Sequence, residues 1–317
     1  MSPANAFTGA RLDRAGDARR RDPAWITAQR EHPAARAVLV GDEGIVMDGD
    51  RLALVPLGQA VGASEPLLLG IDDAGPLFAV DLDIGPAGGE RQPRLIAAGD
   101  RRWNGAAPPA PAGGPRSVPL REAAAVLPQD EGGLAAYVAA LCNWHRRHRF
   151  CASCGSPSEL GEGGLIRACP NCGVHHHPRT DPVVIMLVTD AGRVLLGRAP
   201  SWPARRYSAL AGFVEPGESL EEAVAREVAE ESGVEVGEPR YVASQPWPFP
   251  SSLMLGFEVP WLAGEPRALE DEIQDVRWFS RAEVAAAAAG DPDTPLLLPP
   301  RLAIARRLLE GWLAGRP

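Results

Sequence analysis

The stretch GFVEPGESLEEAVAREVAEESGV, residues 212–234, decides the fold of the domain that contains it. A Pro-Gly pair ending at Gly217 predicts a turn, and Ser219 is a suitable N-cap for a helix. Residues 220–232 contain neither proline nor glycine, and Gly233 stands where a helix commonly ends. The stretch therefore predicts a tight turn followed by one helix over 220–232.

Three glutamates of this predicted helix are close to one another. Glu227 and Glu231 are four residues apart and share one face, and Glu230 lies beside them. Close carboxylates repel, and a hard cation with oxygen ligands, Mg²⁺ or Mn²⁺, relieves that repulsion. The alternative is a solvent-exposed acidic face, which is the usual explanation of such a run by itself.

The whole pattern of the stretch favours the metal. It matches the Nudix box, G-x5-E-x7-R-E-U-x-E-E-x-G-U with U apolar, at every defined position. These positions are Gly212, Glu218, Arg226, Glu227, Val228, Glu230, Glu231, Gly233 and Val234. The chain therefore resembles a Nudix hydrolase.

Composition narrows the class of protein. The chain has 317 residues, enough for two or three domains, and its hydrophobic content of 45% is typical of a globular protein. A net charge of −9 argues against broad, non-specific nucleic-acid binding. Because no apolar run reaches the ~18 residues of a membrane-spanning helix and no secretory signal is readable, we expect a cytoplasmic protein without a membrane partner.

The first half of the chain shows no catalytic spacing, so we expect a scaffold or dimerisation domain over 36–147. Residues 1–35 are polar and rich in arginine, which predicts a mobile start with one short helix. A stretch rich in proline and glycine, 104–118, predicts a linker, and helices are expected over 120–127 and 131–148. Short apolar runs predict an antiparallel strand meander; they cover 37–40, 44–49, 52–57, 66–71 and 77–82.

Two CxxC pairs predict a zinc ribbon over 148–178. Their cysteines are Cys151, Cys154, Cys169 and Cys172, with fourteen residues between the pairs. Four thiolates complete a tetrahedral shell, so the zinc would be structural rather than catalytic. A redox-active pair is the alternative, but the βαβ context of a thioredoxin-like protein is missing. The histidines that follow, 175–177, are therefore expected in a strand, with one or two of them lining a pocket.

The remaining residues, 179–317, predict an α/β domain. Besides the glutamate-bearing helix, strands are expected over 182–189, 194–199 and 253–260, and helices over 281–289 and 299–314. Strands and helices around a mixed sheet describe an α/β/α sandwich.

A second motif, SQPWPFPSS, covers residues 244–252. Three prolines in five residues preset an extended backbone and hold Trp247 and Phe249 rigidly. Rigid aromatic rings can stack on a planar ring such as adenine or nicotinamide. For an isolated motif, a proline-rich packing loop is the more common explanation.

Downstream of a Nudix box, this motif resembles the signature of the NADH pyrophosphatase branch of Nudix hydrolases, and the preceding four-cysteine motif is a second mark of that branch. The resemblance is close over 148–317 and rests only on domain order over 36–147. It implies an N-terminal Nudix-like domain without a box, a zinc ribbon, a catalytic Nudix domain and a homodimer. It also implies hydrolysis of the pyrophosphate of NAD(H) to AMP and nicotinamide mononucleotide, and bacterial members are similar to enzymes that remove NAD caps from RNA.

The resemblance assigns roles to individual residues. The Mg²⁺ or Mn²⁺ ligands would be Glu227, Glu230, Glu231, Glu272 and the carbonyl of Ala211. The substrate contacts would be Phe213, Gln245, Pro246, Trp247, Pro248, Phe249, Pro250, Ser251, Ser252, Ala305 and His177. Relatives usually have a tyrosine in place of His177, donated across the dimer to the base, so this position departs from the family.

The catalytic roles follow from the same residues. Arg226 would pair with a neighbouring glutamate and orient it. Either Glu231 or Glu272 would accept the proton of the attacking water, and the sequence does not choose between them. Divalent metal ions would neutralise charge on the diphosphate.

Two other functions remain open. One is a Nudix enzyme for a different nucleoside diphosphate, such as ADP-ribose or a dinucleoside polyphosphate; the motif at 244–252 argues against it and His177 leaves it open. The other is a non-catalytic nucleotide sensor or RNA-binding regulator. The intact box and the negative net charge argue against this second function.

Overall fold

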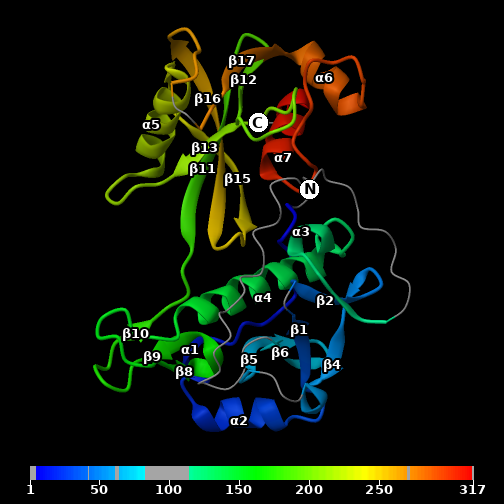
Figure 1. The fold of residues 1–317 in the computed structure, drawn as a ribbon, viewed down its shortest axis with the longest axis vertical. Helices are drawn as coiled ribbons and strands as arrows, with labels where there is room; N and C mark the ends of the chain where they lie inside the picture. Colours follow the sequence, from blue (N-terminus) through cyan, green and yellow to red (C-terminus); the bar gives the residue numbers. More distant parts are fainter. Residues whose placement is uncertain (1–4, 42, 61–63, 83–113, 270–271, 316–317) are drawn as a thin grey trace.

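The computed structural model describes residues 5–41, 43–60, 64–82, 114–269 and 272–315. They form two mixed sheets with a small third sheet, the zinc ribbon, beside them (Figure 1). The N-terminal sheet lies at the bottom of Figure 1 and the C-terminal sheet at the top, with helix α4 (Gln129–Arg147) between them. No helix of the described residues is long and apolar enough to cross a membrane.

The start of the chain is packed against the N-terminal domain. It contains two helices, α1 (Asp17–Arg20) and α2 (Pro23–Glu31). The ring of Phe7 is 2% exposed, and the buried guanidinium of Arg20 donates to backbone carbonyls of the sheet. The prediction of a mobile start with one helix is therefore wrong for the described residues. A few buried side chains anchor the segment, and its mostly polar composition does not reveal them.

The N-terminal sheet has a parallel pair at its centre. Its strands are β1 (Arg36–Val40), β2 (Ile45–Asp48), β3 (Arg51–Leu52), β4 (Leu54–Pro56), β5 (Leu67–Asp72), β6 (Gly75–Asp81) and β7 (Arg116–Val118), with the short 3-10 turn η1 (Leu57–Gln59) after β4. The order is β3-β2-β1-β6-β5, with β4 beside β1 and β7 beside β2. Because β1 and β6 run parallel, the predicted meander is wrong. Apolar runs indicate strands but do not specify their direction.

Strand β7 also corrects the predicted linker. Residues 104–113 lie outside the described part of the chain, but Arg116–Val118 pairs with β2 instead of connecting domains freely.

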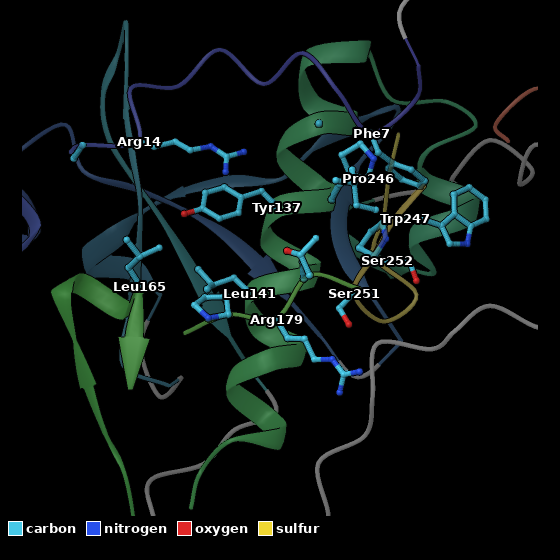
Figure 2. A pocket seen from close by; sticks show the side chains of 18 of the residues that line it. Phe7, Arg14, Tyr137, Leu141, Leu165, Arg179, Pro246, Trp247, Ser251 and Ser252 are labelled. Atoms are coloured by element: carbon cyan, nitrogen blue, oxygen red, sulfur yellow. The ribbon is translucent and has the colours of Figure 1, made fainter. Parts of the chain in front are cut away.

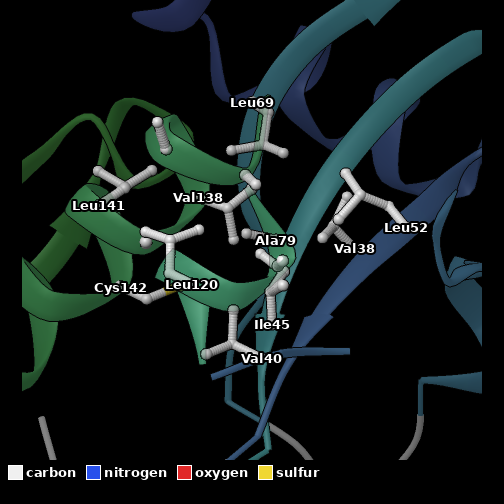
Figure 3. Packing of buried hydrophobic residues seen from close by; sticks show 14 of the residues in the cluster. Val38, Val40, Ile45, Leu52, Leu69, Ala79, Leu120, Val138, Leu141 and Cys142 are labelled. Atoms are coloured by element: carbon white, nitrogen blue, oxygen red, sulfur yellow. The ribbon is translucent and has the colours of Figure 1, made fainter. Parts of the chain in front are cut away.

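Two helices cover this sheet, α3 (Leu120–Ala123) and α4. The buried face of α4 carries Val138, Leu141 and Cys142, which pack in one core cluster with Val38 and Val40 of β1 (Figure 3). The predicted helix over 131–148 is confirmed within two residues, whereas the one over 120–127 is limited to one turn.

One ion pair is completely buried inside the N-terminal domain. Arg146 of α4 donates to both carboxylate oxygens of Asp81, at 2.6 and 2.7 Å, and both side chains are at most 1% exposed. Bidentate geometry offsets the desolvation of the two charges, so removing one partner would leave the other buried and unpaired.

The zinc ribbon follows α4. Its strands are β8 (Glu159–Gly161), β9 (Ile166–Ala168) and β10 (His175–His176), with the 3-10 turn η2 (Glu162–Gly164) between β8 and β9. The expected histidine strand is confirmed for two residues, but it pairs with β9 of the ribbon.

The C-terminal domain is an α/β/α sandwich, as predicted. Its strands are β11 (Asp181–Asp190), β12 (Arg193–Arg198), β13 (Leu210–Phe213), β14 (Glu235–Val236), β15 (Arg240–Trp247), β16 (Ser252–Ala263) and β17 (Asp275–Ser280). Its helices are α5 (Leu220–Ser232), α6 (Arg281–Ala289) and α7 (Ile304–Leu313). The sheet order is β14-β16-β11-β12-β17, with β13 on β11 and β15 on β16, and β11 runs parallel to β16.

The sequence of strand β11 explains why helices cover both faces of the C-terminal sheet. Its apolar side chains alternate between two clusters, as strand geometry requires. Val184 and Met186 pack with Val228 of α5, whereas Ile185 packs with Leu308 of α7. The strand and helix predictions are confirmed, except that α7 begins at Ile304 and not at 299. Pro300 disfavours a helical backbone at 299, and residues 301–303 form a turn before the helix.

Candidate active site

Helix α5 is fixed at both ends by its own sequence. The Ser219 hydroxyl accepts from the backbone N–H of Glu222, and the Glu222 carboxylate accepts from the N–H of Ser219, forming a capping box. The helix ends at Gly233, whose φ of 71° is left-handed. These caps set the position of the glutamates along the helix.

Arg226 holds the acidic residues in place. It donates to both oxygens of Glu218, at 2.6 and 2.9 Å, to Glu227 at 2.8 Å and to Glu230 at 2.9 Å. It also donates to the carbonyl of Phe213, at 2.9 Å. The bond from Arg226 lowers the pKa of Glu218 to about 2, and the same bond raises the pKa of Arg226. This geometry agrees with the orienting role predicted for Arg226.

Strand β13 brings its backbone against the helix. The Ala211 N–H donates to Glu231, at 3.2 Å, and the Glu231 side chain is buried. A Cβ added at Gly212 would lie 1.8 Å from the carboxyl carbon of Glu227. A side chain at 212 would therefore displace the carboxyl group of Glu227 from its present position.

A pocket of about 330 Å³, which we call the catalytic pocket, opens beside these groups. The residues predicted from the sequence that line it are Ala211, Glu231, Gln245, Trp247, Glu272 and Ala305. They come from β13, α5, β15, the segment before β17 and α7, so the fold gathers residues that are up to 94 positions apart (305 − 211). Trp202, Ser208 and Ile273 also line it, and no motif pointed to them.

Other predicted residues do not line this pocket. The side chain of Phe213 is 59% exposed, and Glu227 and Glu230 lie outside the lining. His177 is exposed, just after β10. Phe249 packs against the N-terminal core, with its ring 5.8 Å from that of Phe7.

The motif at 244–252 is a hairpin between β15 and β16 rather than a loop, so its side chains face two sides. Gln245 and Trp247 face the catalytic pocket, whereas Pro246, Pro248, Ser251 and Ser252 line a second cavity of about 580 Å³, the hairpin pocket (Figure 2). Trp247 lines both cavities. Pro250 lines neither of them.

Gln245 makes internal hydrogen bonds with its whole amide. Its Nε2 donates to the carbonyls of Ala6 and Leu302, and its Oε1 accepts from the N–H of Ile304 at 2.8 Å. The residue is 1% exposed. Gln245 therefore ties the N-terminal segment and the start of α7 to the hairpin, a role that the motif did not reveal.

The start of the chain contacts the hairpin directly. The Asn5 amide donates to the Ser244 carbonyl, and the Phe7 ring lies edge-on to Trp247 at 6.0 Å. Sequence reasoning missed these residues because no periodicity or motif marks a contact between positions more than two hundred residues apart.

The four cysteines fit a zinc ion. Their sulfur atoms all lie within 4.8 Å of one another, with the Cys151–Cys172 pair at 3.6 Å and the Cys154–Cys169 pair at 3.5 Å. Tetrahedral zinc with Zn–S bonds of about 2.3 Å separates its sulfurs by roughly 3.8 Å. A hydrogen bond from His176 lowers the pKa of Cys151 to about 5, which favours the thiolate that zinc needs.

The carboxylates of the box offer oxygen donors, which suit a hard divalent cation. Among the described residues, the four cysteines are the only group of three or more side chains that lie close enough together to hold a metal ion. The glutamates are instead held by Arg226 and by the N–H of Ala211. The donor chemistry therefore fits a divalent metal, in a site that has oxygen ligands and a fixed scaffold.

Comparison with known families covers almost the whole chain. The NUDIX domain family matches residues 178–298, the NADH pyrophosphatase zinc ribbon domain matches 146–176, and the NADH pyrophosphatase-like rudimentary NUDIX domain matches 28–144. These matches follow the order of the three sheets.

Individual relatives agree with this assignment. The NAD-capped RNA hydrolase NudC of Stutzerimonas stutzeri (strain A1501) is 39% identical over 286 residues, which cover 88% of each chain. The NAD-capped RNA hydrolase NUDT12 of Homo sapiens is 43% identical over 201 residues, 60% of this chain and 44% of that protein. A solved NUDIX hydrolase from Nitrosomonas europaea covers 53% of this chain and 94% of its own, with a TM-score of 0.42 and 24% identity. The three family matches and the NudC relative show that the chain is a member of the Nudix hydrolase family, in the NADH pyrophosphatase branch that carries a zinc ribbon.

Proposed function

We propose that the protein hydrolyses the pyrophosphate bond of NAD(H), giving AMP and nicotinamide mononucleotide, and also removes NAD caps from RNA. The observation that carries this proposal is the catalytic pocket, which combines two carboxylates, Glu231 and Glu272, with the ring of Trp247. The carboxylates suit chemistry at a diphosphate, and the ring suits a base. The names of the relatives support the same substrates.

Each box residue then has a distinct task. Arg226 presents Glu227 and Glu230 in one orientation, so that their oxygens, with Glu231 and the Ala211 carbonyl, are available to Mg²⁺ or Mn²⁺. A bound divalent cation supplies positive charge to the diphosphate. Glu231 or Glu272 accepts the proton of the attacking water, because both line the pocket.

The zinc of the ribbon is structural in this proposal, because four thiolates leave no position for substrate. We further propose a cytoplasmic homodimer in which the exposed His177 of one subunit approaches the site of the other. An exposed imidazole just after β10 suits such a role.

A product assay tests the proposal. NADH, NAD⁺, NAD-capped RNA and ADP-ribose are each incubated with the protein in Mg²⁺ and in Mn²⁺, and products are separated by chromatography. We expect AMP and the nicotinamide mononucleotide from NAD(H), and 5′-monophosphorylated RNA from the capped substrate. Turnover of ADP-ribose alone would instead support the alternative Nudix activity, and no turnover of any substrate would contradict the proposal.

A further inference from the structure

Beside the catalytic pocket lies a smaller cavity of about 180 Å³, which we call the arginine pocket. The two cavities share Trp202, Ser208, Trp247 and Ala303, so they adjoin each other. The remaining lining includes two arginines, Arg121 of α3 and Arg206 of the segment between β12 and β13. The pocket is therefore built from both large domains.

The side chains of both arginines are partly buried. Within the described residues, neither side chain forms an ion pair, and the Nε atom of each is buried without a hydrogen-bond partner. Burial lowers the pKa of both, although an arginine remains charged at neutral pH. A buried donor without a hydrogen-bond partner is costly, so both Nε groups favour a ligand that accepts from them.

Packing explains one arginine but not the other. The Arg121 guanidinium lies 4.5 Å from the ring centre of Phe249 and 5.3 Å from that of Trp247, which are favourable cation–π contacts. Arg206 has no such ring contact among the described residues. The charge of Arg206 therefore has no acidic or aromatic partner among the described residues, and an anion in the pocket would supply one.

The size of the cavity limits the ligand. At about 180 Å³ it is smaller than the 300–1,000 Å³ or so of typical small-molecule sites, so it suits one group rather than a whole nucleotide. Two guanidinium groups that present N–H donors match the oxygens of a phosphate. The carboxylates of the catalytic pocket mark the position of the cleaved diphosphate, so this phosphate would be an additional one.

We propose that the arginine pocket binds a third phosphate of the substrate, one carried on the ribose of its adenosine half. This inference rests on the proposed function. Two substrates have such a group: NAD-capped RNA, in which the 3′ oxygen of that ribose carries the next phosphodiester, and a dinucleotide phosphorylated at the 2′ oxygen. Free NAD(H) has only the diphosphate, so the pocket would bind the two substrates with a third phosphate more tightly than free NAD(H).

Calorimetric titration of three probes tests the site without any turnover. They are AMP, adenosine 3′,5′-bisphosphate and adenosine 2′,5′-bisphosphate. Wild-type protein should bind one bisphosphate at least about 10-fold tighter than AMP, the effect of one hydrogen-bonded charge. Preference for the 3′,5′ isomer identifies RNA as the source of the phosphate, and preference for the 2′,5′ isomer identifies the phosphorylated dinucleotide.

Arg206→Met should reduce this ratio of dissociation constants to about one. Arg301→Met is the matched control, because this substitution removes the same charge. Arg301 is exposed and adjoins Pro300 and Leu302 of the pocket, but it does not line the pocket itself. The control should keep the wild-type ratio. Arg206→Lys, which retains the charge, should keep part of the preference, and thermal unfolding confirms that each variant is folded.

Two results would overturn the inference. The first is equal affinity of wild-type protein for all three probes. The second is an Arg206→Met variant whose affinities for AMP and for the bisphosphates fall by the same factor, which would mean that Arg206 contacts the 5′-phosphate that all probes share. Hydrolysis of NADH by the wild-type protein, measured in parallel, separates these results from a failure of the proposed function.

Discussion

The N-terminal and C-terminal domains are two versions of one topology. In each domain the first strand forms a hairpin with the second, and a later strand pairs with the first strand in parallel. The first strand, its parallel partner and the helix that follows are β1, β6 and α4 in the N-terminal domain. They are β11, β16 and α7 in the C-terminal domain. The outer neighbours of this hairpin also correspond. Strand β4 pairs with β1 as β13 pairs with β11, and β7 pairs with β2 as β17 pairs with β12. The main difference lies after β4 and β13, where the first has the turn η1 and the second has helix α5.

This difference supports the proposal that the sheet serves as a scaffold and that helix α5 carries the chemistry. In the N-terminal domain, the charged pair Asp81–Arg146 is sealed in the core and forms hydrogen bonds internally. In the C-terminal domain, the acidic residues of α5 lie at the surface or beside a cavity. The charged pair of the first domain is thus satisfied within the protein, whereas Glu231 of the second lines a cavity that we propose to be the active site.

The largest effect is expected from breaking the buried pair. Asp81→Asn keeps the shape but leaves Arg146 charged and without its ionic partner, so the free energy of unfolding should fall by about 3–5 kcal/mol. Denaturant unfolding measures this loss. Glu258→Gln is the control, because its bond to Arg240 is partly exposed and should contribute at most about 1 kcal/mol. Equal losses in the two variants would show that the N-terminal domain does not depend on its buried charges.

The second effect concerns activity rather than stability. Glu231→Gln should lower kcat/KM for NADH by roughly 10²–10³-fold, the effect of a positioned catalytic group, with little change in unfolding. Glu221→Gln is the control, since Glu221 lies on the same helix and faces solvent. If Glu231→Gln retained full activity, the assignment of α5 as the chemical element would be wrong.

The smallest effect is expected at Trp247, where the two domains meet. Stacking on a base is worth roughly 1–3 kcal/mol, so Trp247→Ala should lower kcat/KM for NADH by about 5- to 150-fold. Activity on a diphosphate substrate without that base should fall less. Phe249→Ala is the matched control, because Phe249 packs on the same core but does not line the catalytic pocket. An equal change of the substrate ratio in both variants would mean that Trp247 acts through packing alone.

The sequence predicted the local features well. Helix α5, its caps and the cysteine cluster depend on residues close in the chain, and the structure has them where the motifs stand. Glu272 and Ala305 were identified only through the family, and the fold brings both to the same pocket.

Long-range features were not predictable in the same way. The parallel pairing of β1 with β6 depends on a chain path that the apolar pattern does not encode. The unpaired charge of Arg206 is visible only when the surroundings of its side chain are known, since arginine is common throughout this chain. The contact of Phe7 with Trp247 likewise depends on how two distant segments meet.

The hydrogen bonds of Gln245 have a consequence for dividing the protein into pieces. A fragment limited to 178–298, the span of the NUDIX family match, would contain the complete box. It would lack the Ala6 carbonyl, the Leu302 carbonyl and the Ile304 N–H, which are the hydrogen-bond partners of the Gln245 side chain. The side chain of Gln245 in the candidate active site therefore depends on two segments that lie far apart along the polypeptide, the start of the chain and the start of α7.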